Sequence, residues 1–143
     1  MSTRREFLQR TAGAVAASAD FAFLDNLPPL SAQQVQRSIA PVQEDVDALV
    51  RLIEDTPRNR LLEEVGTRVR GGTSYQQVLA ALMLAGVRGI QPRPVGFKFH
   101  AVLVVNSAHI ASLAAQDRDG WLPLFWALDN FKAAQARNAQ QGD

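Results

Sequence analysis

Apolar residues recur every three or four positions through most of the chain after residue 40, which is the spacing of amphipathic helices. Two such stripes lie in the first half, made up of Val42, Val46, Leu49, Val50 and Ile53, and then of Leu61, Leu62, Val65 and Val69. They predict one helix that begins near Pro41 and a second that runs roughly from Pro57 to Arg70. A third helix is expected from Thr73 to about Gly89, and it is apolar nearly all round at Val78 to Val87.

The predicted helices begin and end at residue types that are favoured at helix termini. Thr56 is predicted to be the N-cap of the second helix, with Pro57 in the first turn, where the missing amide hydrogen of proline costs nothing. Gly71-Gly72 is a stop signal for that helix. Thr73 and Gln76 have the spacing of a capping box, which predicts the start of the third helix.

Residues 97–115 allow two interpretations. The alternation of apolar residues fits a strand over 97–105, through Phe97, Phe99, Ala101, Leu103 and Val105. However, the sequence continues to Ala115 without a breaker and with strong helix formers, so we favour one helix from about Phe97 to Ala115. Asp117 to Gly120 predicts a polar turn. A last helix begins near Pro123 and carries Leu124, Phe125, Leu128 and Phe131.

Together these segments predict an all-α fold, with about five helices packed as an irregular bundle over residues 41–143. Residues 20–40 are rich in Asn, Pro, Ser and Gln and contain Pro28-Pro29, so we interpret them as a linker. Trp121 and Trp126 are expected to help close the core. The aromatic residues of the last helix are also expected to leave an apolar patch, which predicts either self-association or a missing C-terminal segment.

Composition narrows the classes of function. Of the 143 residues, 47% are hydrophobic and 20% are charged, as in an average globular domain. The first 19 residues hold three of the 15 basic and one of the 14 acidic residues, so 12 and 13 remain in the body, and no nucleic-acid partner is expected. The lack of cysteine excludes disulfides, thiolate metal sites and cysteine nucleophiles. No run approaches the roughly 20 apolar residues of a membrane-spanning helix.

The first 19 residues have the three parts of a secretory signal peptide. A basic start is followed by a short apolar middle, Thr11 to Ala19, which ends in the small residues Ala17-Ser18-Ala19. This layout predicts cleavage after Ala19. An uncleaved or later-cleaved signal is an alternative, because the apolar stretch Phe21 to Leu24 follows directly. A second alternative is that these residues form an ordinary amphipathic helix and no signal peptide.

The segment from Thr3 to Leu8 reads TRREFL and resembles the twin-arginine (Tat) translocation signal. That signal has Ser or Thr, two arginines, any residue, Phe, Leu and commonly Lys, and Gln9 departs from it at the last position. The resemblance implies that the Tat translocase recognises Arg4, Arg5, Phe7 and Leu8. It also implies a periplasmic or other extracytoplasmic location.

The two histidines, His100 and His109, are the first candidates for a site. Nine residues rotate a helix by about half a turn beyond whole turns and advance it by about 13 Å, so the two rings point in opposite directions. A core or boundary imidazole is the simpler interpretation of either one, and Asn106 is placed to pair with His109. His100 is the better candidate for a metal or cofactor site, since Arg93 and Lys98 lie near it in a proline-stiffened approach to a helix start that suits an anion.

Other polar groups favour structural roles. Glu44, Asp45 and Asp47 suit the first turn of a helix, where carboxylates meet the positive end of the dipole. Glu63 and Glu64 are neighbours whose side chains diverge on a helix. Asp117-Arg118-Asp119 lacks the spacing of a calcium loop. No phosphate-binding glycine loop, GxSxG elbow or HExxH motif is present, so no catalytic residue or cofactor can be named.

The stretches GVRGIQPRPVGFKFHAVLVVNSAHIASL and WLPLFWALDNFKAAQARN resemble the N-terminal part of longer, Tat-exported bacterial proteins of no assigned activity, over about Leu61 to Asp143. Those longer chains have further helical segments with additional histidines, which implies that His100 is one of a set and that this chain is truncated. Two functions remain open. One is an exported, non-catalytic helical domain, and the other is part of an exported metal- or cofactor-dependent enzyme with His100 at its site.

Overall fold

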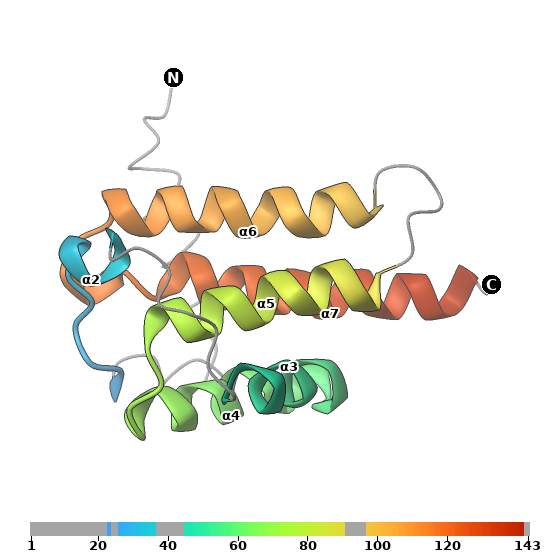
Figure 1. Cartoon of the computed structure of the whole chain (residues 1–143), viewed down its shortest axis with the longest axis horizontal. Coiled ribbons are helices and arrows are strands. Elements are labelled where there is room, and N and C mark those ends of the chain that lie inside the picture. Colours follow the sequence, from blue (N-terminus) through green and yellow to red (C-terminus); the bar gives the residue numbers. More distant parts are fainter. Residues whose placement is uncertain (1–22, 24–25, 37–44, 91–96, 142–143) are drawn as a thin grey trace.

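The computed structural model describes residues 23, 26–36, 45–90 and 97–141 (Figure 1). Every regular element in these ranges is a helix, which confirms the predicted all-α fold. The elements are α2 (Ala32–Gln36), α3 (Asp45–Asp55), α4 (Arg58–Arg70), α5 (Tyr75–Gly89), α6 (Phe97–Ala114), the 3-10 helix η2 (Asp117–Asp119) and α7 (Leu122–Gln141). The predicted signal peptide, residues 1–19, lies outside the described residues.

The helices form three tiers (Figure 1). α6 lies along one side, α5 and α7 occupy the middle, and α3 and α4 lie on the other side, with α3 against α5 and α4 against α7. Consecutive helices α5, α6 and α7 run antiparallel, as short connections require. The middle tier is buried from both sides, so the core residues with no exposed surface include Val78, Leu82, Leu124 and Leu128.

Two predicted helix starts are wrong by one residue. The N-cap of α5 is Ser74 rather than Thr73: its hydroxyl accepts from the amide of Gln77 at 3.2 Å, and the Gln77 side chain accepts from the amide of Ser74 at 2.8 Å. Both Thr73/Gln76 and Ser74/Gln77 have capping-box spacing, and the second pair places Tyr75 in the core. At α4, Pro57 rather than Thr56 holds the N-cap position, without a side-chain cap.

The helix favoured for residues 97–115 is confirmed, because α6 runs from Phe97 to Ala114, and the strand alternative is wrong. Its buried positions within the described side chains, Val105, Ala108 and Ser112, repeat at helical spacing. The helix contacts both α5 and α7. The sequence of α6 is apolar on more than one face of the helix. Over the nine residues 97–105 its apolar positions therefore fit the alternation of a strand as well as the spacing of a helix.

The two tryptophans have different environments. Trp121 is 5% exposed and closes the core as predicted, with its indole nitrogen donating to the carbonyl of Pro28 at 3.0 Å. Trp126 is 48% exposed, so its expected role in the core is wrong. Phe125 and Phe131 are buried too. The expected apolar patch of several aromatic residues on the last helix is therefore reduced to Trp126.

Part of the segment interpreted as a linker belongs to the packed domain. Within residues 20–40, Leu30 and Val35 are 5% and 2% exposed, and α2 contacts α5 and α6. The amide of Leu30 donates to the carbonyl of Asp117 at 2.8 Å, and the side chain of Gln76 donates to the carbonyl of Gln34. Pro28 and Pro29 prevent a regular helix at that point of the chain. The apolar residues Leu30 and Val35, which follow them, are nevertheless buried against the bundle. Five α-helices, α3 to α7, lie in the described part of residues 41–143, as predicted, and α2 adds a sixth before that range.

Phe23 extends this packing to the start of the described chain. Its ring lies 5.7 Å from that of Phe125, centroid to centroid. It also contacts α4 at Gly66, where a β-carbon would approach the Phe23 ring to 2.9 Å. Gly66 is thus required by a close side-chain approach inside a helix that otherwise disfavours glycine.

Candidate functional site

The predicted site at His100 cannot be assembled from the described residues. Arg93 lies outside them, as does the loop from Gln91 to Gly96. The backbone of α6 places Lys98 and His100 in its first turn, in agreement with the expected helix start, but their side chains lie outside the described part. Metal or anion binding at His100 stays a prediction. Among the described residues, no group of three or more His, Asp or Glu side chains is arranged to hold a metal ion.

The second histidine takes part in a polar contact between α5 and α6. The hydroxyl of Tyr75 lies 3.1 Å from Nδ1 of His109, and the two rings are tilted with centroids 5.9 Å apart. Tyr75 is only 2% exposed, whereas His109 is half-buried. This contact replaces the Asn106–His109 pairing expected from the sequence, and Asn106 is exposed. The sequence interpretation treated Tyr75 only as part of a helix start, although it is the single tyrosine of the chain.

Ser112 is the third polar member of this cluster. It is 3% exposed, and its Oγ has no hydrogen-bond partner among the described residues. Burial raises the pKa of the Tyr75 phenol, and the nearby Ser112 hydroxyl opposes that effect by lowering the pKa. Among the described residues, the Ser112 hydroxyl forms no hydrogen bond with Tyr75. A buried unpaired hydroxyl costs about 1–3 kcal/mol, so Ser112 calls for a physical explanation.

Aromatic rings enclose the cluster on the side of α7. The Trp121 ring lies 5.7 Å from that of Tyr75 and 6.2 Å from that of Phe125, centroid to centroid. These apolar neighbours keep the Tyr75 hydroxyl away from water and leave His109 and Ser112 as its polar surroundings. Both hydroxyl-bearing residues of the cluster, Tyr75 and Ser112, are buried, so neither presents a nucleophile to solvent.

Lys132 is a buried cation that the sequence interpretation did not single out. Its Nζ donates to the carbonyl of Glu54 and to Oε1 of Gln135, both at 2.7 Å, and the residue is 6% exposed. Glu54 lies in the last turn of α3, where carbonyls lack intrahelical partners and cations interact favourably with the helix dipole. Desolvation lowers the pKa of Lys132, and the charges of Asp55 and Glu54 partly oppose it. We interpret Lys132 as a hydrogen-bonded link between α7 and the end of α3.

Replacing Lys132 by Met is expected to lower the free energy of unfolding by about 1–3 kcal/mol, because the Glu54 carbonyl keeps only the amide of Gln135 at 3.2 Å. In the parent, the lowered pKa means that the unfolded chain binds this proton more tightly, so stability should rise as the pH approaches the ordinary value of 10.5. That rise should disappear in Lys132→Met. Urea unfolding between pH 7 and pH 10 measures both effects.

The matched control for Lys132 is Arg60→Met, since the Arg60–Glu64 pair on α4 joins two side chains that are 65% and 38% exposed. Exposed pairs of this kind contribute about 0–1 kcal/mol. If Lys132→Met and the parent have equal free energies of unfolding over the whole pH range, Lys132 does not link α3 and α7.

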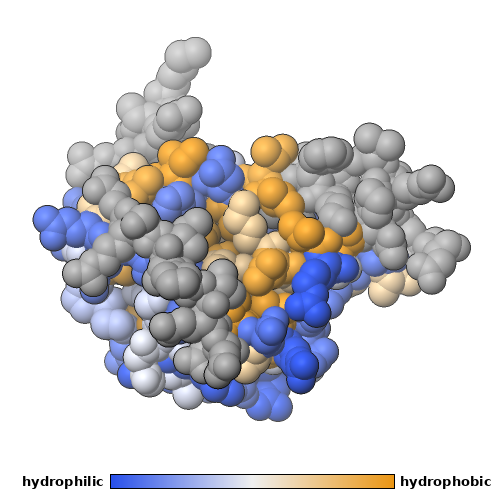
Figure 2. Space-filling model, viewed as in Figure 1, coloured by the Kyte–Doolittle hydropathy of each residue, from blue (hydrophilic) through white to orange (hydrophobic). Residues whose placement is uncertain are grey.

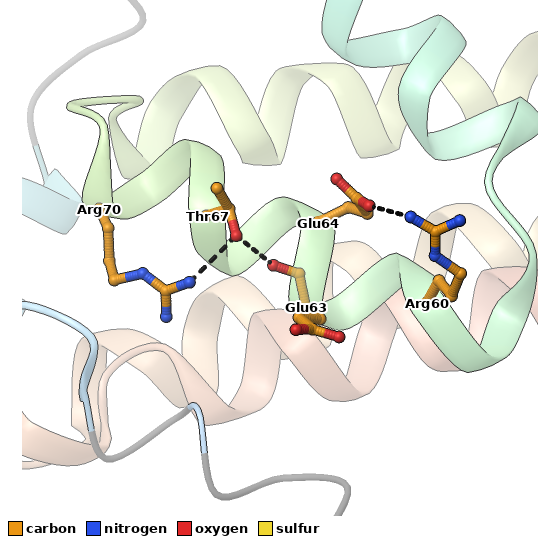
Figure 3. A network of polar contacts seen from close by, with 5 residues as sticks. All are labelled: Arg60, Glu63, Glu64, Thr67 and Arg70. Atoms are coloured by element: carbon orange, nitrogen blue, oxygen red, sulfur yellow. Dashed lines mark hydrogen bonds and ion pairs between the residues drawn. The ribbon is translucent and has the colours of Figure 1, made fainter.

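The outer face of α4 is a solvated, charged surface (Figure 3). Arg60 donates to Glu64 at 2.6 Å, Thr67 donates to the carbonyl of Glu63 at 3.0 Å, and Arg70 donates to Thr67 at 3.0 Å. The carboxylates of Glu63 and Glu64 point in different directions, as expected for neighbours on a helix. These residues form local pairs along one helix and do not converge on a common point.

An open, mostly polar hollow of about 350 Å³ lies beside the turn between α4 and α5. Arg68, Gly72, Thr73 and Gln77 line it together with α3. Gly72 has a φ of 107°, the left-handed region that glycine adopts without strain, and this lets the chain reverse between the two helices. Arg68 is the only ionisable side chain among the described lining residues, so these residues provide no acid/base pair.

A second surface lies over α5 and α6 and is apolar. Met83, Val87, Leu103 and Ile110 are large aliphatic side chains that are 40%, 46%, 58% and 58% exposed. Figure 2 shows hydrophobic side chains gathered over these two helices, whereas the part of the molecule nearest α3 and α4 is largely hydrophilic. We call the set Met83, Val87, Leu103 and Ile110 the α5–α6 face. It is the largest group of exposed aliphatic side chains in the described part of the chain.

The α5–α6 face also lacks charge. No residue from Tyr75 to Val87 or from Phe99 to Ala114 is Asp, Glu, Lys or Arg. By contrast, α4 alone contains Arg58, Arg60, Glu63, Glu64, Arg68 and Arg70. Polar rims and uncharged apolar centres are typical of surfaces that bind other proteins.

No described helix is both long and apolar enough to cross a lipid bilayer. No known protein family matches the chain, and neither a curated protein nor a solved structure matches it.

Proposed function

We propose that this chain is an exported helical domain that works by binding protein through the α5–α6 face rather than by catalysis. The single observation that carries this proposal is the exposure of four large aliphatic side chains on α5 and α6, within stretches of the two helices that contain no Asp, Glu, Lys or Arg. Exposing them costs free energy in water, at about 25 cal/mol per Å² of apolar surface. A partner that covers them recovers this free energy.

The partner that fits this face best is a second copy of the same chain. A two-fold axis brings the same patch of each copy together, so residues of like charge would meet across it. The α5–α6 face carries no Asp, Glu, Lys or Arg over the residues that would meet, so two identical faces can pack without repulsion. A partner selected by charge would find no complementary group there.

The size of the face supports reversible rather than permanent pairing. Helices of 15 and 18 residues are about 22 and 27 Å long, and two side by side are about 20 Å wide. This footprint is at the lower end of specific interfaces, which bury about 800 Å² per partner. We expect dimerisation in the micromolar range.

Export is supported by the twin-arginine pattern at Arg4 and Arg5 and by the small residues that end at Ala19. In this proposal the Tat translocase is a transient partner, and the domain acts in the periplasm or another extracytoplasmic space. The alternative of a metal- or cofactor-dependent enzyme at His100 receives no support from the described residues.

Sedimentation velocity of the purified chain over a range of concentrations tests the binding proposal. Leu103→Glu should weaken dimerisation by at least about tenfold, because each copy would have to bury a carboxylate against apolar side chains. The fold should persist, since Leu103 is 58% exposed.

Trp126→Glu is the matched control, as it replaces an exposed apolar residue on α7, a helix that contributes no residue to the α5–α6 face. Dimerisation should be unchanged in this variant. If the parent chain stays monomeric at every concentration, or if Trp126→Glu rather than Leu103→Glu disrupts the dimer, the proposal is wrong.

A further inference from the structure

The outer side of α6 carries one row of exposed side chains. Within the described side chains of this helix, the exposed positions are Leu103, Asn106, Ser107, Ile110 and Ala114. Successive turns of the helix contribute them at spacings of three or four residues, so they lie on one face, opposite the face that packs on the core. α6 itself forms an outer tier of the bundle (Figure 1). We call this row the α6 stripe.

The α6 stripe has polar residues in its middle and large apolar residues on either side of them. Leu103 and Ile110 lie at equal distances from the midpoint between Asn106 and Ser107. At about 1.5 Å per residue, each apolar residue is about 5 Å from that midpoint along the helix axis. A second α6 helix that is turned end over end about the midpoint therefore presents apolar residues to apolar residues and polar residues to polar residues.

We propose that two copies of this chain pair through antiparallel α6 helices, with the two-fold axis between Asn106 and Ser107. This inference rests on the dimerisation proposed above and specifies which part of the α5–α6 face lies at the centre of the dimer. On each side of the axis, Leu103 contacts the partner's Ile110. At the axis, Asn106 of each copy lies opposite the partner's Ser107.

Hydrogen bonding favours this register over its neighbours. The amide of Asn106 both donates and accepts, as does the hydroxyl of Ser107, so the two pairs across the axis can satisfy each other. A shift of one helical turn in either direction would place Asn106 or Ser107 against an apolar residue of the partner. A polar group that is buried without a partner costs free energy, and a single polar position fixes the register of coiled coils for this reason.

The charges at the two ends of α6 favour the antiparallel arrangement over the parallel one. Lys98 lies in the first turn of α6, whereas η2, with the sequence DRD and a net negative charge, follows the last turn. In a parallel pair, like charges would share each end. In the antiparallel pair, Lys98 of one copy lies at the end of the partner's α6 that leads to η2, so each end combines opposite charges. The two helix dipoles are opposed as well.

Disulfide capture tests this geometry, because the chain has no cysteine of its own. Under mild oxidation, Ser107→Cys should form a covalent dimer with itself, since the two residues lie about 1.5 Å apart along the axis. Leu103→Cys alone and Ile110→Cys alone should not, because each lies about 10 Å along the axis from its own counterpart, whereas a disulfide spans about 4.4–6.8 Å between α-carbons. An equimolar mixture of these two variants should cross-link at least about tenfold faster than either alone.

The matched control is Asn59→Cys, because Asn59 is exposed on α4, which lies on the side of the bundle away from α6 (Figure 1). It should give no covalent dimer, either alone or mixed with Leu103→Cys. Non-reducing electrophoresis of the full-length variants measures the covalent dimer. All four substitutions are at exposed positions, so folded proteins are expected.

Two results would overturn the antiparallel register and leave the proposed dimerisation standing, provided that Leu103→Glu still disrupts the parent dimer. One is self-cross-linking of Leu103→Cys, which indicates a parallel pair. The other is a failure of Ser107→Cys, or of the Leu103→Cys and Ile110→Cys mixture, to cross-link faster than the Asn59→Cys control. A parent chain that stays monomeric would overturn both proposals.

Discussion

Phe125→Ala is expected to lower the free energy of unfolding by about 3–5 kcal/mol, the usual cost of removing a buried phenylalanine ring. Phe125 is 2% exposed and stands between the rings of Phe23 and Trp121, at 5.7 and 6.2 Å between centroids. The cavity would lie where α7, α4 and the segment containing Phe23 meet. Three parts of the chain would lose contacts together.

Trp126→Ala is the control for Phe125→Ala, because the two residues are adjacent on α7 and differ in exposure. Trp126 is 48% exposed, and a surface substitution of this kind should cost under about 1 kcal/mol. Urea denaturation gives both values from the transition midpoints at a common slope. A larger loss in Trp126→Ala than in Phe125→Ala would mean that α7 is rotated relative to the arrangement described.

Replacing Arg4 and Arg5 together by Lys is expected to abolish export, because charge is kept while the paired guanidinium groups of the signal are lost. The chain should then accumulate unprocessed in the cytoplasm. In the parent, N-terminal sequencing of the exported form should find Asp20 as the first residue. Cell fractionation with immunoblotting measures the distribution.

The control for the export experiment is Arg10→Lys, which changes an arginine outside the pair. Its export should match that of the parent. Normal export of the doubly substituted chain would remove the basis for the twin-arginine interpretation and, with it, the extracytoplasmic location.

The proposed cleavage has a structural consequence for the mature domain. Cleavage after Ala19 leaves Phe23 as the fourth residue of the mature chain, and Phe23 packs against Gly66 and Phe125. Phe23 is therefore partly buried and packed against the core. Removal of residues beyond Ala19 would reach the core within a few positions.

The sequence by itself determined the fold class and the location of the helices. Stripes such as Leu61, Leu62, Val65 and Val69 identify a helix with one buried face, because side chains three or four residues apart lie on the same side. Pro57 marked the start of α4 and Gly71 its end, each to within a residue. These signals are local, so a single chain segment contains the information.

The same local signals could not decide between equivalent neighbours. Thr73/Gln76 and Ser74/Gln77 both form capping-box patterns, and only the docking of Tyr75 into the core selects the second. Trp121, just before α7, and Trp126, within it, cannot be told apart from the sequence, and only the packing of the helices shows that the first is buried and the second exposed.

Only the tertiary structure brought together Tyr75 and His109, which are 34 residues apart, and Lys132 and Glu54, which are 78 residues apart. A hydrogen bond between helices depends on the angle and register of their packing, and no periodicity within either helix encodes these. The packing of Leu30 and Val35 was missed for the same reason, since their burial depends on a surface made by distant residues. Helical periodicity therefore identified the buried face of each helix, while packing between the helices determined which polar groups meet there.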